Sequence, residues 1–338
     1  MTQLDDKPVM PVAAGEPRRL DVRSLMQTRP WLPALVTSVV LLVVGQIVSP
    51  GFASWGSLNQ ILAASAILAI VSCGQSIVMI SGDFGIDLSV GQVMSLAAIA
   101  GYMSMKGGSN ALVAVAVVVV IAVGGILGGL SGILVSVIRL PALVVTLGTL
   151  VVATGLELVL ASKGTPDGSV PPLLNVLTTS SVLGVKWVTF LAVVVVVGMF
   201  FLTRRSRFGR MLFFVGSNRE AARLSGLPVR RIVFVTYVLA GICSGLSGLL
   251  LLSYAGQANL DLGSGYLVLS IAATVIGGTS LAGGEGSVVG AATGAIAFMV
   301  TNTLMLTLGV SDAVRQSVVG VLLMVLLAFN VRTPKLRQ

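Results

Sequence analysis

Histidine is absent from this 338-residue sequence, cysteine occurs only twice, and charged residues make up 10% of the chain. Without histidine, an imidazole proton relay and a histidine-ligated metal site are both excluded. Cys73 and Cys243 lie inside apolar runs, so they are expected to be small buried side chains rather than a disulfide or metal ligands. A soluble globular domain has about a quarter of its residues charged, and the low charge therefore excludes that class.

Long apolar runs dominate the sequence, and 55% of its residues are hydrophobic. Runs of about 20 residues recur, which is the length that a helix needs to cross about 30 Å of hydrocarbon. The sequence therefore predicts an all-α polytopic membrane protein with about ten transmembrane helices. The expected spans are 31–49, 59–80, 89–105, 111–137, 141–162, 187–202, 232–254, 265–281, 286–308 and 312–331.

The 21 basic residues outnumber the 12 acidic ones, and most lie at four places: the first 30 residues, Arg139, the stretch 204–231 and the last seven residues. Positive charge stays on the cytoplasmic side of membrane proteins, and an even number of expected spans separates each place from the next. The sequence thus predicts a cytoplasmic N-terminal tail (1–30), a transmembrane domain (31–331) with a cytoplasmic loop (203–231), and a cytoplasmic tail (332–338). The charge indicates topology and not a nucleic-acid partner.

Two aspartates stand among glycines in ISGDFGIDLSVG, residues 80–91, between two expected spans. As one helix, residues 59–105 would be about twice the bilayer thickness, so the helix must break here. Asp87 is expected to cap the N–H groups of the third span, next to Ser89. Asp83 is expected to be solvated or to face an aqueous cavity. With a second glycine-rich break at 277–287, this segment is expected to form the inner mouth of a pathway.

The cytoplasmic loop contains GSNREAARLSGLP at 216–228. Ser217 and Glu220 have the spacing of a capping box, and Gly226 is a stop signal. This pattern predicts a helix of about two turns from Ser217 to Gly226, through Asn218, on which Ala221 and Ala222 give a flat surface. We interpret it as a docking helix for another protein; a loop that is merely helical is the alternative.

Glu220-Ala221-Ala222 followed by Gly226 resembles the EAA-xxx-G motif of ABC importer permeases. GIDLSVG (85–91), GLSGILV (129–135), PALVVTLGT (141–149) and GGTSLAGGEGS (277–287) resemble the ribose/simple-sugar branch of these permeases, which is related to branched-chain amino-acid permeases. The similarity extends from about residue 31 to 332. The sequence departs from the family at Asp83-Phe84, where the family usually has Gly-Gly.

The resemblance implies the helical bundle of an ABC importer permease in the bacterial plasma (inner) membrane. Its docking helix would be gripped by an ABC ATPase subunit, and a periplasmic sugar-binding protein would deliver the substrate. It also implies a dimer with a second permease copy or a homologue, surrounded by lipid. No lysine in the chain follows a glycine, so a P-loop is absent. ATP and magnesium must therefore bind to the partner, and this chain is expected to carry no cofactor, no metal and no catalytic residue.

The interiors of the expected spans offer uncharged polar side chains for a pathway, each of which could equally form a helix–helix hydrogen bond. The candidates are Gln75, Thr146, Thr149 and Asn302, with Thr301 and Thr303. They suit a neutral monosaccharide of the ribose, xylose or galactose type, or a small polyol. A branched-chain amino-acid permease is the nearest alternative. An ion-coupled secondary transporter would need charged groups at depth, where only Glu157 comes close. An intramembrane enzyme would need a nucleophile–base pair or metal ligands, and the sequence has no histidine and no expected pair of carboxylates at depth.

Overall fold

The computed structural model describes residues 31–105, 109–164 and 170–331. The two predicted cytoplasmic tails, 1–30 and 332–338, lie outside the described residues. The described chain is helical apart from a small antiparallel hairpin of β1 (Ser181–Val182) and β2 (Val185–Lys186). The predicted all-α class is therefore confirmed.

Each of the ten expected spans contains a helix. In chain order the α-helices are α2 (Leu32–Val48), α3 (Trp55–Ile80), α4 (Val90–Ser104), α5 (Val113–Ile133), α6 (Ala142–Ala161), α7 (Pro172–Thr179), α8 (Trp187–Arg204), α9 (Arg207–Ser217), α10 (Arg219–Leu224), α11 (Val229–Ala255), α12 (Tyr266–Ile276), α13 (Val288–Thr307) and α14 (Asp312–Val331). A 3₁₀ turn (Asn110–Leu112) and a π-helical turn (Leu134–Ile138) extend α5 at its two ends.

Six of these helices are long and apolar enough to cross a membrane: α3, α5 with its flanking turns, α6, α8, α11 and α13. The helices α2, α4 and α12 are apolar but shorter. At 1.5 Å per residue, α4 and α12 are only about 22 and 16 Å long, less than the about 30 Å of a bilayer core. The structure thus supports six spans by length, and the count of ten stays a prediction.

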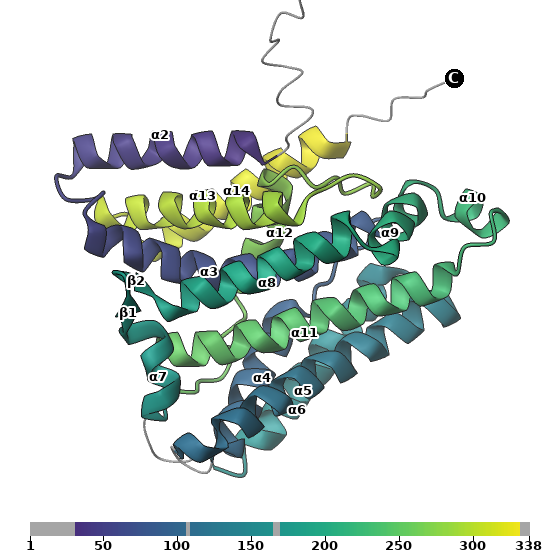
Figure 1. Cartoon of the computed structure of the whole chain (residues 1–338), viewed down its shortest axis with the longest axis horizontal. Coiled ribbons are helices and arrows are strands. Elements are labelled where there is room, and N and C mark those ends of the chain that lie inside the picture. Colours follow the sequence, from purple (N-terminus) through teal and green to yellow (C-terminus); the bar gives the residue numbers. More distant parts are fainter. Residues whose placement is uncertain (1–30, 106–108, 165–169, 332–338) are drawn as a thin grey trace, which may run out of the picture.

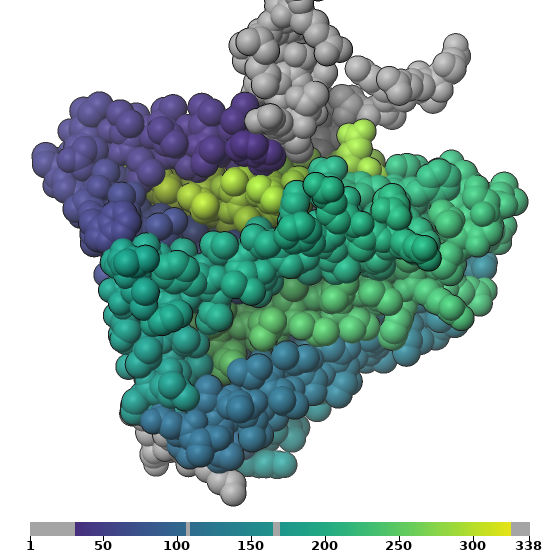
Figure 2. Space-filling model, in the orientation of Figure 1, coloured from purple at the N-terminus to yellow at the C-terminus, as the bar shows by residue number. Residues whose placement is uncertain are grey.

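The helices α2, α3, α8, α11 and α13 run side by side across the molecule (Figure 1). The β1–β2 hairpin and α7 lie at one end of this bundle, which we call the hairpin end, and α9 and α10 lie at the other, the α10 end (Figure 1). The helix α3 is central, because every residue from Ser65 to Ile80 is buried. The space-filling view shows α2 along one edge of the face and α5 along the opposite edge, with α8 and α11 between them (Figure 2).

Glycine explains how closely α5 and α11 cross. A Cβ atom on Gly124 would collide with the backbone of Gly241, and a Cβ atom on Gly241 would collide with the backbone of Gly124. Small residues four apart let helix backbones meet where lipid supplies no hydrophobic drive for association. Cys73 and Cys243 are free and buried, as expected, and Cys243 packs near Gly74 of α3.

Candidate functional site

The predicted docking helix corresponds to α10, but it is shorter than expected and is capped by a different residue. The Asn218 side chain accepts a hydrogen bond from the Ala221 backbone N–H at 2.9 Å. Ser217 is the last residue of α9, and its hydroxyl donates to the Phe213 carbonyl at 2.9 Å. The predicted capping box of Ser217 and Glu220 is therefore wrong, because α9 continues through Ser217. Glu220 instead pairs with Arg223 at 2.6 Å.

Helix α10 projects from the bundle and exposes one apolar side chain at its tip. Leu224 is 79% exposed, whereas Ala222 is fully buried against the bundle. Ala222 thus anchors the helix, and Ala221 is half-buried, so the two alanines do not present the flat surface that the sequence suggested. Gly226 adopts the left-handed conformation (φ +76°), and its N–H bonds the Arg223 carbonyl at 3.0 Å. The predicted stop at Gly226 is confirmed.

The break between α3 and α4, residues 81–89, folds back alongside the last turns of α3. With its amide nitrogen facing the carbonyl, Gln75 donates to the Asp87 carbonyl and accepts from the Asp87 N–H, both at 3.2 Å. Gln75 lies five residues before the end of α3, which puts Asp87 roughly 7 Å inside that helix end. From α6, the Thr146 hydroxyl donates to the Ile86 carbonyl at 3.2 Å. The break is therefore fixed from two sides by side chains that satisfy its buried backbone groups.

The Asp87 carboxylate stabilises the turn that precedes α4. Its Oδ1 atom accepts from the Ser89 N–H at 2.8 Å and from the Ser89 hydroxyl at 2.6 Å. Because Ser89 stands just before the first helical residue, Val90, Asp87 does not bond the amides of the first turn. The expected capping of that turn is thus wrong in detail. Asp87 stabilises the turn that leads into α4 and does not cap the first turn of that helix.

Arg219 of α10 clamps the other half of the break. Its guanidinium lies 2.9 Å from Asp83 Oδ2 and also donates to the backbone carbonyls of Ser81 and Gly82. Asp83 and Phe84 both have left-handed backbone conformations (φ +61° and +49°), which cost non-glycine residues roughly 1–2 kcal/mol each. These are the two positions where the resemblance led us to expect glycine. The side chain of Asp83 is 71% exposed, in agreement with its expected contact with solvent.

The second break, between α12 and α13, touches the first break and the end of α9, directly before α10. The Gly284 N–H donates to the Ile80 carbonyl at 3.0 Å. A Cβ atom on Gly216 would collide with the backbone of Ile80, and a Cβ atom on Gly283 would collide with the backbone of Gly82. Three segments distant in sequence are therefore in direct backbone contact. The contacts among these segments involve glycine backbone atoms, with no side chain between them.

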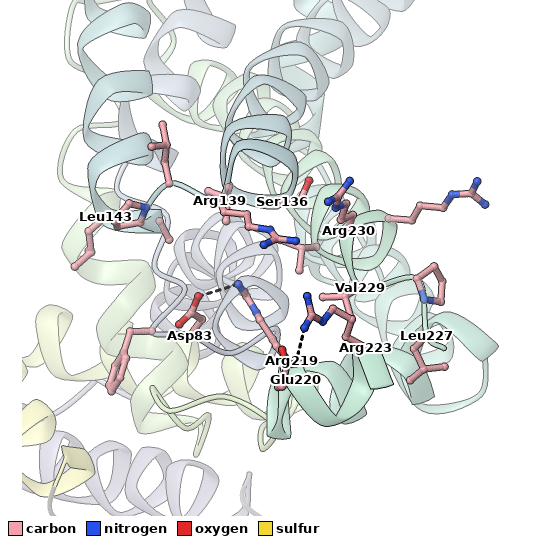
Figure 3. Close-up of a pocket in the computed structure, with 18 residues that line it drawn as sticks. Asp83, Ser136, Arg139, Leu143, Arg219, Glu220, Arg223, Leu227, Val229 and Arg230 are labelled. Atoms are coloured by element: carbon pink, nitrogen blue, oxygen red, sulfur yellow. Dashed lines mark hydrogen bonds and ion pairs between the residues drawn. The ribbon is translucent and has the colours of Figure 1, made fainter. Parts of the chain in front are cut away.

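A cavity of about 980 Å³ opens at the α10 end, between α10, the start of α6 and the π-helical turn. Figure 3 shows Arg139 entering it from one side and Arg219 and Arg223 from the other. Two further arginines, Arg230 and Arg231, and the carboxylates of Asp83 and Glu220 also line it. The structure thus brings Arg139 and the arginines of the loop to the same end of the bundle, as the charge pattern predicted.

The remaining candidate pathway residues do not meet in this cavity. Thr149 shares a 2.7 Å hydrogen bond with Ser131 between α6 and α5, and Asn302 accepts a 3.4 Å bond from Arg315 of α14. Of the sequence-predicted residues, only Asp83 and Glu220 line the cavity. Gln75, Thr146, Thr149 and Asn302 make helix–helix or helix–loop bonds. No group of three or more His, Cys, Asp or Glu side chains that could hold a metal occurs in the part of the chain that the structure describes.

Sequence reasoning overlooked two features. Arg219, which contacts both Asp83 and the break backbone, was counted only as topogenic charge. The motif Asp-Leu-x-x-Gly occurs at 87–91 and again at 261–265, directly before α4 and α12. This internal repeat relates the segment before α4 to the segment before α12. The prediction from the sequence had related the segment before α4 to residues 277–287.

Comparison with known proteins finds the family described as branched-chain amino acid transport system / permease component, matched over residues 57–327. The chain is 38% identical over 296 residues to the probable ABC transporter permease protein y4mJ of Sinorhizobium fredii, which covers 86% of each chain. It is 31% identical to the ribose import permease protein RbsC of Escherichia coli K12, over 88% of this chain and 93% of the relative. It is 28% identical to the D-allose transport system permease protein AlsC of the same organism, over 87% and 89%.

Proposed function

This chain belongs to the family of branched-chain amino acid transport system permease components, and from that premise we propose that it forms the import pathway for a neutral monosaccharide or small polyol. As an ABC transporter permease of the sugar-type branch, it is a non-catalytic, multi-pass membrane subunit of a bacterial importer, and ATP is bound by a partner ATPase. The resemblance stated from the sequence motifs is confirmed. The alternative of an ion-coupled secondary transporter is wrong.

The ATPase docks on α10 in this proposal. The supporting observation is that α10 presents the exposed Leu224 outward while its Arg219 pairs with Asp83 of the first break. Directly before α10, Gly216 at the end of α9 is in backbone contact with Ile80 and Gly284. Closure of the ATPase would push on α10, and the backbone contacts would pass that displacement to α3, α4, α12 and α13. The α10 end is then the cytoplasmic end, in agreement with the arginines gathered there.

A second copy of the chain, or a homologue, covers the outward face of α6 in the complex. Val144, Leu147 and Val151 are 61%, 49% and 66% exposed on that helix, and lipid or another apolar helix suits such a face. The binding protein docks at the opposite, hairpin end, where Leu183 at the hairpin turn is 91% exposed.

The substrate is a small polyhydroxylated molecule. Two relatives are named for ribose and D-allose, and the family description names branched-chain amino acids. The similarity to the two sugar permeases covers nearly the whole chain, which favours a sugar. The test is uptake by vesicles that contain the chain with its ATPase and binding protein. Import of a pentose or hexose only in the presence of ATP supports the proposal, and import of leucine without any sugar refutes the substrate.

A further inference from the structure

The segment 256–265, between α11 and α12, folds back into the bundle from the hairpin end. Gly263 is in backbone contact with Gly91 in the first turn of α4, and its N–H donates to the Ser95 hydroxyl oxygen at 2.8 Å. Next to this contact, the backbone of Met94 packs on Gly248 of α11. Gly248 lies seven residues before the end of α11, so the contact is roughly 10 Å inside the bundle. The N-termini of the two short helices α4 and α12 thus meet inside the protein.

Three polar side chains surround this meeting point. The Gln92 amide nitrogen of α4 donates to Asp261 Oδ1 at 2.8 Å. Glu157 of α6 accepts a hydrogen bond from the Asp261 backbone N–H through Oε1, also at 2.8 Å. We call Gln92, Glu157 and Asp261 the acceptor cluster. Glu157 is buried, whereas Asp261 is exposed at the surface.

The acceptor cluster has hydrogen-bonding capacity that the protein does not use. Glu157 is 1% exposed, yet its second oxygen, Oε2, has no hydrogen-bond partner among the described residues. The same is true of the Gln92 side-chain oxygen. Within the described part of the chain, neither Glu157 nor Asp261 forms an ion pair with Lys or Arg. A buried acceptor without a partner costs about 1–3 kcal/mol, so two of them on residues that both bond Asp261 require a physical reason.

The backbone at Asp261 adds a second cost. Asp261 has a left-handed conformation (φ +58°), and strain of this kind persists where a site requires a particular side-chain position. A purely structural role explains these costs poorly. A carboxylate as buried as that of Glu157 is expensive inside a membrane protein, and in a structural role it would be expected to have a cationic partner.

A ligand that supplies hydrogen-bond donors would satisfy the cluster. The two buried atoms without a partner, Glu157 Oε2 and Gln92 Oε1, are both acceptors, so the ligand must bring donors. The hydroxyls of a sugar are such donors, and carboxylate and amide oxygens accept from them while the ligand stays neutral. In transporters built from discontinuous helices, substrate sites lie where the broken segments meet.

We propose that Gln92, Glu157 and Asp261 form a hydroxyl-binding site through which a neutral polyhydroxylated substrate passes after it leaves the binding protein. This inference rests on the proposed transport function. It goes beyond that function because it places the substrate contact at the meeting point of α4 and α12, near the hairpin end.

The first test measures D-ribose uptake, ATPase rate and thermal stability for Asp261→Asn, Glu157→Gln and Gln92→Ala in the reconstituted complex. Asp312→Asn is the matched control, because Asp312 is an exposed carboxylate outside the cluster that pairs with Arg315 at 2.9 Å. We expect each cluster variant to reduce the specificity constant for uptake about tenfold, the effect of one lost hydrogen bond to a charged or polar group. Asp261→Glu should recover part of the loss, and the melting temperature should stay that of the control. Unchanged uptake in all three variants, or loss of uptake only with loss of stability, overturns the proposal.

The second test measures the accessibility of the site rather than uptake. Asp261→Cys is treated with a water-soluble, membrane-impermeant thiol reagent; Cys73 and Cys243 are buried and serve as the unreactive background. We expect labelling of Asp261→Cys from the binding-protein side and slower labelling when D-ribose-loaded binding protein is present. If the wild-type complex imports no sugar, the proposed function fails, whereas absence of labelling contradicts this site. If sodium ions slow the labelling in the absence of sugar, the cluster is a cation site, and this result also overturns the proposal.

Discussion

Replacement of Gly216 by alanine tests whether α10 is rigidly joined to the helix breaks. Gly216 lies in α9, and an added Cβ atom would collide with the Ile80 carbonyl and lie 2.7 Å from the Gly284 nitrogen. Non-bonded atoms need about 3.5 Å, so the facing segments must separate by roughly 2 Å. Overpacking of this kind costs about 1–3 kcal/mol, and loss of the 3.0 Å Gly284–Ile80 hydrogen bond adds about 1–3 kcal/mol. We therefore expect a destabilisation on the order of 2–6 kcal/mol, confined to the α10 end.

The assay compares Gly216→Ala with Gly198→Ala in the purified complex. Gly198 is also helical, but nothing lies within 4 Å of its added Cβ atom, so this control should be neutral or slightly stabilising. In Gly216→Ala, binding-protein-stimulated ATP hydrolysis should no longer drive uptake, and the melting temperature should fall. If the two variants transport equally well at equal stability, the rigid connection between α10 and the breaks does not exist.

Three further substitutions test separate parts of the site. Asn218→Ala should remove about 1 kcal/mol of capping and weaken ATPase co-purification, whereas Ser217→Ala should have little effect because its hydroxyl bonds within α9; equal effects would contradict the assigned cap. Phe84→Gly should raise the melting temperature of the purified protein, since it removes about 1 kcal/mol of left-handed strain, and a lower value would refute this. Asp87→Asn should be tolerated in uptake assays, because an amide oxygen can still accept from Ser89, whereas Asp87→Leu should not; similar uptake by both would reject the turn-stabilising role.

The fold class and the family could be read from the sequence because both depend on signals that are local in the chain. Apolar runs gave the positions of the ten helical segments to within a few residues. Arginine placement correctly grouped Arg139 with the loop residues. The stop at Gly226 was also predictable, since a left-handed residue at the end of a helix favours glycine.

The site itself depends on contacts between distant segments, which hydropathy does not encode. Nothing local to Gln75 indicates that its amide bonds the backbone of Asp87, and nothing local to Arg219 indicates Asp83. The capping box failed because two residues with capping side chains, Ser217 and Asn218, compete, and the length of α9 decides between them. The depth of the breaks also escaped prediction, because a helix that is too short to span can either end early or begin inside the bundle.

ATP-driven import of a neutral sugar is the central claim, and one measurement tests it most directly. Vesicles with the permease, its ATPase and its binding protein are offered labelled D-ribose and labelled leucine together, with ATP or a non-hydrolysable analogue supplied to the ATPase. The account predicts that D-ribose or another monosaccharide accumulates only with hydrolysable ATP, and that leucine stays outside. Accumulation of leucine with no sugar tested, or of sugar without ATP hydrolysis, would contradict it.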